Sequence, residues 1–467
     1  MPVIFVPAHV FCSIILTVEG YVMNSGETKK TKGFWGFVWC LGIAGQLCWN
    51  MENQWFNTFV YEKIAKDPTI ISWMVAISAT ATTISTFLTG TATDRRGRRR
   101  YAVSIGYILW GIFTILFGTT EFIMKGASTT SSLLMTAGVA AVAADAIMSF
   151  FGSMGNDSGF NAWMNDHMNE SNKGQIGAAL ATQPIIGTIV GTVAGGMLIG
   201  SENNYMRLFV VMGVFVIGCG VISLFTLKDA PDLVPHKEGS FWAQFASIFN
   251  FKKYFKLKEL VWVNLTLAAY FIAFNMYFTH LGNYMIYYLG FTADLMGFME
   301  GIGLILAMIL AIPATKFINE GKHVPLAFIA VWFNIVGLLE LGFFVRPDNV
   351  NTGSILNPAM LIGVFFIGVG YVVFLQTISV WAKALYPKEA KGQFEGIRIL
   401  FFVLIPMVVA PLISTPIIKK NGEIINEYGL TEYLPTEVLF LVGAGVSLIV
   451  FLPLIMAARY SKKGKTE

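Results

Sequence analysis

The sequence predicts an all-α membrane protein in which twelve transmembrane helices form two pseudo-symmetric six-helix bundles. Three observations predict this fold. The 467 residues are 55% hydrophobic and only 13% charged, whereas a soluble protein carries about a quarter charged residues. Apolar runs long enough to cross a bilayer recur along the whole chain, and short motifs recur at equivalent places in its two halves.

The apolar runs define the expected helices. A helix needs about 20 predominantly apolar residues to cross the hydrocarbon core of a bilayer. Short polar or basic connections separate runs of this length. We expect spans at 34–60, 69–92, 101–124, 132–162, 175–200, 205–227, 259–288, 292–316, 324–345, 356–382, 394–417 and 436–458.

The Lys and Arg residues indicate the orientation of these spans. If both termini lie in the cytoplasm, most of the 32 Lys and Arg residues fall in connections on that side. Arginines crowd into residues 95–100, and lysines recur through residues 228–258. Because basic residues between short spans stay on the cytoplasmic side, the sequence predicts a multi-pass protein of the cell membrane with cytoplasmic termini.

The connection at 228–258 divides the spans six and six. It contains a basic amphipathic stretch, which we expect to form a linker helix on the cytoplasmic membrane face. Residues 1–22 lack the cationic start of a signal peptide, so we expect Met23 to be the natural first residue, with a short membrane-surface segment as the alternative. The expected parts are an N-terminal segment (1–32), an N-terminal bundle (33–227), the linker (228–258), a C-terminal bundle (259–458) and a cytoplasmic tail (459–467).

The two halves repeat a motif after the fourth span of each. Trp163 precedes Lys-Gly-Gln (173–175) by ten residues, and Trp381 precedes the same tripeptide (391–393) by ten residues. Duplicated six-helix halves are typical of secondary transporters, and they disfavour a channel.

The connection between the second and third spans reads GTATDRRGRRR, residues 90–100. Its pattern of glycines, aspartate and arginines resembles the signature loop of the major facilitator superfamily, and a generic basic turn is the alternative. The resemblance implies a secondary transporter that works by alternating access, with this loop helping to hold one state. The matching residues are Gly90, Asp94, Arg95, Gly97, Arg98 and Arg99.

The first span carries amide side chains on one helix face. They recur at i, i+4, i+7, i+8 and i+11, which places them within about 100° of arc. Amides both donate and accept hydrogen bonds, which suits a polyol; hydrogen bonding between helices is the alternative. Glu52 points away from this face and is a weaker candidate for charge coupling. The amides are Gln46, Asn50, Asn53, Gln54 and Asn57.

The fourth span carries polar residues at every fourth position, starting at Asp145. An ionised carboxylate at mid-span costs about 2.5–3.5 kcal/mol on insertion scales, so we expect Asp145 to be protonated or paired. Asp145 and Asp157 are each candidate proton sites, and hydrogen-bonded packing is the alternative for each. Asn161 is a further candidate contact to a solute.

The second half offers fewer candidates. Asn275 lies in the seventh span and Gln376 in the tenth, and we expect both to contact a solute. Glu300 lies near mid-depth in the eighth span and is a candidate for charge coupling. Arg398 lies about one turn into the eleventh span, where it is either a counter-ion for a buried carboxylate or snorkels to the inner surface.

Three stretches resemble a narrower family, the glycoside–pentoside–hexuronide:cation symporters, to which the melibiose carrier belongs. They are GNDSGFNAWMND (155–166), KGQIG (173–177) and YPKEAKGQFEGIRILFFVLIPM (386–407), and the resemblance extends from Gly33 onward. It implies uptake of a sugar or glycoside together with sodium, lithium or protons. It also implies that Asp157 binds sugar hydroxyls.

One departure from that family bears on the coupling ion. Its sodium-coupled members carry two aspartates one turn apart on the second helix, where this chain has Thr82 and Thr86. Hydroxyls alone compensate a cation poorly. We therefore expect proton coupling rather than sodium coupling, with facilitated diffusion as the alternative.

Other function classes find little support in the sequence. It contains no HxxxH, GxSxG or phosphate-binding loop, so we expect no catalytic residue, no metal site, no cofactor and no enzyme activity. The basic residues are explained by topology, so we expect no nucleic-acid partner. The expected partners are a small solute and the lipid bilayer, and the expected state is a monomer. A carrier of lipids or other small solutes on the same fold is the alternative.

Overall fold

The computed structural model describes residues 29–124, 131–169, 172–237, 239–248, 251–387, 391–426 and 429–463. Segment 1–22 and the expected start at Met23 lie outside the described residues. Within them the chain is mostly helical, which confirms the predicted all-α class.

The helices of the first half follow the expected spans closely. Several are continued by a second helical segment, and one contains a π-helical turn. Their bounds are α2 (Lys29–Lys63), α3 (Pro68–Arg96), α4 (Arg100–Gly118), α5 (Glu121–Met124), α6 (Ser131–Ser153), the π-helical η1 (Met154–Phe160), α7 (Asn161–Asp166), α8 (Lys173–Ile199) and α9 (Tyr205–Thr226).

The helices of the second half also coincide with the expected spans. They are α12 (Lys258–Asn283) with the π-helical η2 (Tyr284–Tyr288), α13 (Ala293–Asn319), α14 (His323–Phe344), α15 (Pro358–Ala384), α16 (Lys391–Ile399), the π-helical η4 (Leu400–Leu404), α17 (Ile405–Asn421), α18 (Val438–Ser447), the 3-10 turn η5 (Leu448–Val450) and α19 (Phe451–Lys463).

The connection between the halves is helical on both sides of residues 249–250, which lie outside the described residues. The helical segments are α10 (Phe241–Ile248) and α11 (Phe251–Tyr254). The aromatic ring of Tyr254 packs against Phe394 and Phe401 with centroid distances of 6.2 and 5.9 Å. This contact attaches the end of the connection to α16 and η4 of the second half.

Eleven helices in the described part of the chain are long and apolar enough to cross a membrane. The remaining expected span lies in α2, whose 35 residues are long enough at about 1.5 Å per residue. Its buried and half-buried amides make it more polar than the others. The chain is therefore a multi-pass membrane protein.

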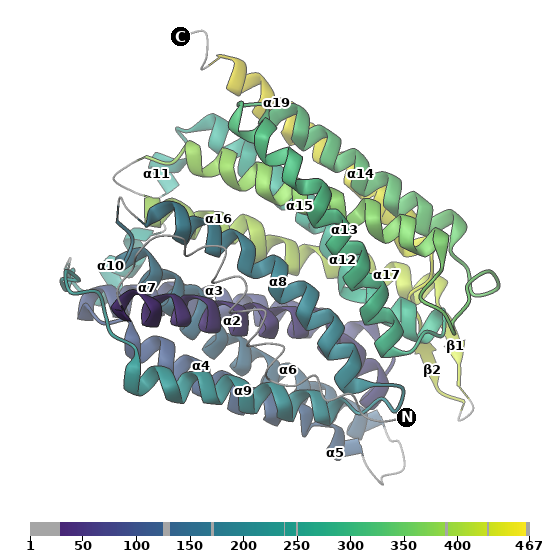
Figure 1. Cartoon of the computed structure of the whole chain (residues 1–467). Coiled ribbons are helices and arrows are strands. Elements are labelled where there is room, and N and C mark those ends of the chain that lie inside the picture. The colour runs from purple at the N-terminus through teal and green to yellow at the C-terminus, as the bar shows by residue number, and fades with distance from the viewer. Residues whose placement is uncertain are drawn as a thin grey trace.

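Figure 1 shows the helices in two groups, with α2 to α9 (purple to teal) below and α12 to α19 (green to yellow) above. The groups meet where α2 contacts α12, α8 contacts α13, and α3 contacts α17. The contact of α8 with α13 is very close. A methyl carbon added to Gly196 would lie 2.4 Å from the Ala293 carbonyl oxygen, and one added to Gly297 would lie 2.6 Å from the Thr192 carbonyl oxygen.

A small hairpin joins the two groups at one end. Strands β1 (Glu423–Ile425) and β2 (Thr431–Tyr433) pair antiparallel, and the Tyr433 amide donates to the Lys66 carbonyl at 2.8 Å. The Lys66 ammonium also pairs with Glu432 at 3.0 Å. We call this the hairpin end of the molecule, and the opposite end, which carries residues 90–100, the signature-loop end.

Candidate functional site

Two of the predicted amides of α2 form a buried network with α8. The Asn50 amide nitrogen donates to the Thr192 hydroxyl at 3.2 Å, and that hydroxyl donates to the Gln54 amide oxygen at 2.9 Å. All three side chains are buried. Because a buried polar group without a partner is costly, this network fixes the rotation of α2 against α8.

The network continues across the boundary between the two helix groups. The Gln54 amide nitrogen donates to Oε2 of Glu300, which projects from α13. Glu300 is only 5% exposed, and within the described chain its Oε1 atom has no hydrogen-bond partner. The structure therefore brings together an amide and a carboxyl that the sequence presents 246 positions apart.

The other predicted amides of α2 do not join this network. The Asn53 and Asn57 amide nitrogens donate to the carbonyls of Trp49 and Asn53 on their own helix, at 2.7 and 2.8 Å. Gln46 is half-buried at a close approach of α8, where a methyl carbon on Gly187 would lie 2.4 Å from its Cβ. The expected single face is thus divided between contacts to α8 and hydrogen bonds within α2.

Glu52 faces α6 on the other side of α2. Its Oε1 atom accepts a hydrogen bond from the Ser149 hydroxyl at 2.8 Å, and its Oε2 atom is buried without a partner in the described residues. Asp145 lies one turn before Ser149, is 1% exposed, and interacts electrostatically with Glu52. The Ser78 hydroxyl of α3 lies beside both carboxyls. These contacts place two acids and two hydroxyls together inside the first helix group.

Asp157 lies on the π-helical segment η1, half-buried beside Ser153 and Trp49. It lies within electrostatic range of Glu52. A π-helical turn inserts an extra residue into an α-helix and occurs often at functional sites. It carries Asp157 toward the same region as Glu52 and Asp145.

Thr86 and Thr82 of α3 both contact α6, the first through its hydroxyl and the second through its backbone carbonyl. The Thr86 hydroxyl lies 2.6 Å from the Ser153 hydroxyl, and Ser153 donates to the Thr82 carbonyl at 2.9 Å. Among the described residues, no group of three or more His, Cys, Asp or Glu side chains has the geometry to hold a metal ion. The region is a set of carboxyls and hydroxyls joined by hydrogen bonds.

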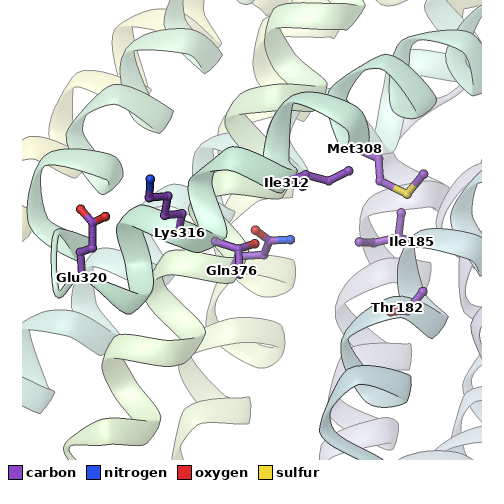
Figure 2. Close-up of a pocket in the computed structure, with 8 residues that line it drawn as sticks. Thr182, Ile185, Met308, Ile312, Lys316, Glu320 and Gln376 are labelled. Carbon is purple, nitrogen blue, oxygen red and sulfur yellow. The ribbon is translucent and has the colours of Figure 1, made fainter. Parts of the chain in front are cut away.

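Gln376 lines a separate cavity of about 730 Å³ at the signature-loop end of α13. Figure 2 shows Met308 of α13 and Ile185 of α8 facing each other across it, with the Gln376 amide extending toward α8. The lining is largely apolar, with Lys316 at its outer part. The two helix groups are thus separated by an opening at this end.

Three predicted residues lie apart from these clusters. Asn275 is buried, and its amide donates to the Phe271 carbonyl of its own helix at 2.9 Å. The Arg398 guanidinium lies 5.3 Å from the centre of the Phe402 ring. Asn161 begins α7 and is half-buried.

The signature loop is tied together around Arg99. Its guanidinium pairs with Asp94 at 2.5 Å and with Asp166 at 2.9 Å, and it donates to the Thr93 hydroxyl at 2.6 Å. Burial opposes the charged form, but the bonds and charges of Asp166 and Asp94 outweigh burial and raise the pKa of Arg99 above its ordinary value. The loop therefore keeps a fixed positive charge at the junction of α3, α4 and α7.

Two further features of the loop explain its residue types. Gly97 has φ of +61°, and a methyl carbon there would lie 2.9 Å from Pro235. Glycine is therefore required, because it adopts the left-handed conformation readily and has no Cβ atom. Arg95 donates to the Gly239 carbonyl at 3.0 Å and to Gln244 at 2.9 Å. Through Arg95 the loop contacts the connection between the halves. Of the other two predicted residues, Arg98 is exposed, and Gly90 faces Ser158.

The hairpin end is closed by contacts that cross between the helix groups. Lys419 pairs with Asp67 at 3.3 Å, the hydroxyls of Ser72 and Thr415 are hydrogen-bonded, and the Tyr287 hydroxyl donates to a carbonyl of α2 at 3.0 Å. Together with the hairpin itself, these contacts hold the groups together at one end while the cavity separates them at the other.

Several residues of the site were not predicted from the sequence. Thr192 and Ser78 are short hydroxyl side chains in spans where hydroxyls are common, so neither stands out. The glycines of α8 are a signal for Thr192, because Thr192 directly follows Gly191, where a methyl carbon would lie 2.4 Å from Asn50. Glycines at intervals of four residues mark the face on which α2 approaches.

The sequence profile of the Major Facilitator Superfamily matches residues 38–356. No curated protein sequence matches the chain.

Three solved structures share the fold at low sequence identity. A mutant of the nucleoside transporter NupG is 14% identical with a TM-score of 0.64, covering 90% of this chain and 98% of that one. The inward-open xylose transporter XylE from E. coli is 13% identical with a TM-score of 0.62, covering 89% and 94%. A bacterial homologue of the human lysosomal transporter Spinster, in an inward-facing and occupied conformation, is 14% identical with a TM-score of 0.61, covering 93% and 98%.

Proposed function

The chain belongs to the Major Facilitator Superfamily, and we propose that it is a secondary active transporter of a sugar or glycoside that is driven by protons. The observation that carries this proposal is the arrangement of buried amides and carboxyls around α2. Amides face the boundary between the helix groups, where a solute must pass, and carboxyls face the interior of the first group.

The amides support a polyhydroxylated solute. Asn50, Thr192 and Gln54 offer donors and acceptors in a row, and hydroxyl groups of a sugar can exchange with such bonds. Trp49, the residue before Asn50, is half-buried, and its ring centre lies 4.9 Å from that of Trp110, which places an aromatic pair near the amides for a sugar ring. The similar structures of a xylose transporter and a nucleoside transporter are consistent with a ring-shaped polar solute on this fold.

The carboxyls support coupling to protons. Glu52 and Asp145 lie near each other without a basic partner among the described residues. Two carboxylates in a medium of low dielectric repel strongly, and one shared proton removes that repulsion. Asp157 lies near Glu52. In this proposal a solute bound to Asp157 is therefore close to the two acids that bind the proton. The absence of a carboxyl at Thr82 and Thr86 favours protons over sodium.

The arrangement of the two ends corresponds to one state of an alternating-access cycle. If the termini are cytoplasmic, the hairpin end is the outer end and the cavity opens inward. In this proposal the chain resides in the cell membrane and works like the glycoside–pentoside–hexuronide:cation symporters that its sequence resembles. The other half of the cycle requires the hairpin-end contacts to break.

A second candidate is a carrier of amphipathic or lipid-like molecules. The specific observation in its favour is the cavity, whose lining includes Ile185, Met308 and Ile312. Against it stand the polar side chains of α2, which an apolar tail would leave without partners. A facilitator without ion coupling remains the third candidate and would use the same amides.

Reconstituted uptake distinguishes these candidates. Purified protein in proteoliposomes is tested with a panel of labelled glycosides under an imposed proton gradient, an imposed sodium gradient, or neither. Accumulation above the external concentration with the proton gradient supports the proposal. Accumulation with sodium alone contradicts the proton assignment. Uptake of a fluorescent lysolipid with no glycoside uptake would overturn the solute assignment.

A further inference from the structure

We propose that Glu300 is a proton-binding site in the second helix group, and that its occupancy controls whether the molecule stays closed at the hairpin end. The proposal rests on the proposed function in one respect, since a proton-driven carrier must link proton binding to conformational change. It concerns a different group from the Glu52 and Asp145 pair, which lies wholly within the first helix group.

The position of Glu300 joins it to the closing surfaces. It lies on α13 between Gly297 and Gly301, and methyl carbons on these glycines would lie 2.6 Å from the Thr192 carbonyl and 2.5 Å from Val193 of α8. Glu300 accepts a hydrogen bond from Gln54 of α2. It therefore lies where the two helix groups approach most closely, and it belongs to one group while its partner belongs to the other.

The environment of Glu300 contains no compensating charge in the described part of the chain. The ionisable groups on the elements packed against α13 have other positions or partners. Tyr287 donates to α2 at 3.0 Å, the His323 ring lies tilted against Trp381 at 4.6 Å, and the Tyr371 ring packs on Phe274 at 4.9 Å. The others include Tyr284, Tyr288, Glu340 and Lys383 and, on α2, Glu52, Tyr61, Glu62 and Lys63, and no described hydrogen bond or ion pair joins any of them to Glu300.

An ionised carboxylate in this place would be poorly compensated. One oxygen accepts a single hydrogen bond from a neutral amide, and the other is buried with no described partner. Burying an unpaired charge costs much more than burying a neutral group. A proton on Glu300 removes the charge, and its carbonyl oxygen continues to accept from Gln54.

The direction of the coupling follows from this cost. Opening the hairpin end moves α13 away from α8 and α2, which breaks the bond to Gln54 and lets water reach Glu300. Water stabilises the ionised form, whereas the closed state tolerates only the neutral form. Protonation therefore favours closure and deprotonation favours opening, because a ligand shifts a conformational equilibrium toward the state that binds it better.

The geometry favours a proton over a metal cation. The Gln54 amide oxygen accepts from Thr192 at 2.9 Å, which directs its N–H group toward Glu300. Hard cations require oxygen ligands, and an N–H donor facing the carboxylate occupies the place where such a cation would bind. A proton requires only the free oxygen.

The test measures the opening of the hairpin end without any solute. Spin labels are attached at Glu202→Cys and Asp348→Cys, exposed positions on opposite helix groups at that end, in a chain whose native cysteines are replaced by Ser. Pulsed electron resonance then gives the distance distribution across a pH series in lipid nanodiscs. For one linked proton, the ratio of open to closed molecules rises by up to about tenfold per pH unit.

The variants decide the assignment. Glu300→Gln keeps an acceptor for Gln54 but carries no titratable proton, so we expect a closed distribution that no longer changes with pH. Gln54→Leu removes the donor but keeps the acid, so we expect more opening at every pH with the pH dependence retained. Glu320→Gln removes an exposed carboxyl at the far end of α13, just after its last residue and paired with Lys322 at 2.8 Å, and should show the pH dependence of the unmodified chain.

Two outcomes would overturn the proposal. A pH dependence that survives in Glu300→Gln would place the controlling proton elsewhere, and closure driven by sodium at constant pH would replace the proton by a metal cation. Because no solute is present, a failure of the sugar assignment leaves these distances unchanged. The Gln54→Leu arm keeps the test decisive if Glu300→Gln does not fold.

Discussion

The two helix groups share a plan of six spans but differ in what fills their interiors. Around α2, α3 and α6 the first group places carboxyls, amides and hydroxyls, with Asp145 only 1% exposed. The second group fills the equivalent region with aromatic rings, such as Tyr270 stacked on Phe374 at 3.8 Å. Its buried polar link to the first group is Glu300. The difference teaches that duplicated folds can divide their work, with most buried acids and solute-facing amides in one half and, in the described part of the other, a single buried acid, Glu300, within an aromatic interior.

The largest expected effect comes from neutralising the acid of the first group. Asp145→Asn keeps the shape of the side chain but removes its ability to release a proton. We expect solute accumulation under a proton gradient to fall to a ratio of about one, because the proton shared by Asp145 and Glu52 can no longer be exchanged with solute binding in the first group. Exchange of labelled for unlabelled solute should persist.

Asp232→Asn, an exposed carboxyl of the connection between the halves, serves as the matched control and should accumulate solute normally. Full accumulation by Asp145→Asn would remove the first group's acid from the coupling scheme. Glu300 in the second group would then be the remaining candidate for the coupling proton.

The next effect concerns solute affinity. Gln54→Ala removes a buried amide and leaves Thr192 and Glu300 without their partner. Loss of one to two such hydrogen bonds weakens binding by about 10- to 100-fold, measured as the solute concentration for half-maximal exchange. Asn421→Ala, whose amide serves only its own exposed helix end at 2.8 Å, is the control. An unchanged affinity in Gln54→Ala would move the solute away from α2.

A smaller effect is expected at the signature loop. Asp94→Asn weakens one of the two carboxylate contacts of Arg99 and leaves Asp166 in place. Because Asp94 is partly exposed, the lost interaction is modest, and we expect transport to slow about 3- to 10-fold with little change in solute affinity. The two quantities are separated by measuring equilibrium binding beside uptake, and an equal loss in both would argue against a conformational role.

The smallest effect tests the second group. The Asn275 amide donates to a carbonyl of its own helix and does not join the amide network of α2, so we expect it to contribute little to solute binding. Asn275→Ala should change solute affinity by less than about threefold, as expected for a local side-chain bond to the backbone. A loss as large as that of Gln54→Ala would show that solute contacts are shared equally by the two groups.

The sequence predicted the spans well because hydrophobic length and basic connections are local properties. The start of α3 also has local causes, since Asp67 accepts from the Thr69 amide at 2.9 Å and Pro68 begins the helix. The linker helix expected between the halves stays a prediction, since helical segments flank residues 249–250, which lie outside the described part of the chain.

The candidate site was predicted only in its parts. Helical spacing placed the α2 amides on one face, yet which neighbour each amide meets depends on where α8 and α13 approach. The glycines that set this approach lie more than 100 positions away. Glu300 was a candidate by its type alone, and its bond to Gln54 required the packing of two separate helix groups.

The central claim is that solute and proton move together, and a pH measurement tests it most directly. Solute is added to proteoliposomes in a weakly buffered suspension with no imposed gradient, and the external pH is recorded. The account predicts a transient rise in external pH on solute addition, which a proton ionophore abolishes and Asp145→Asn lacks. Solute entry with no change in external pH would contradict the claim and identify the chain as a facilitator.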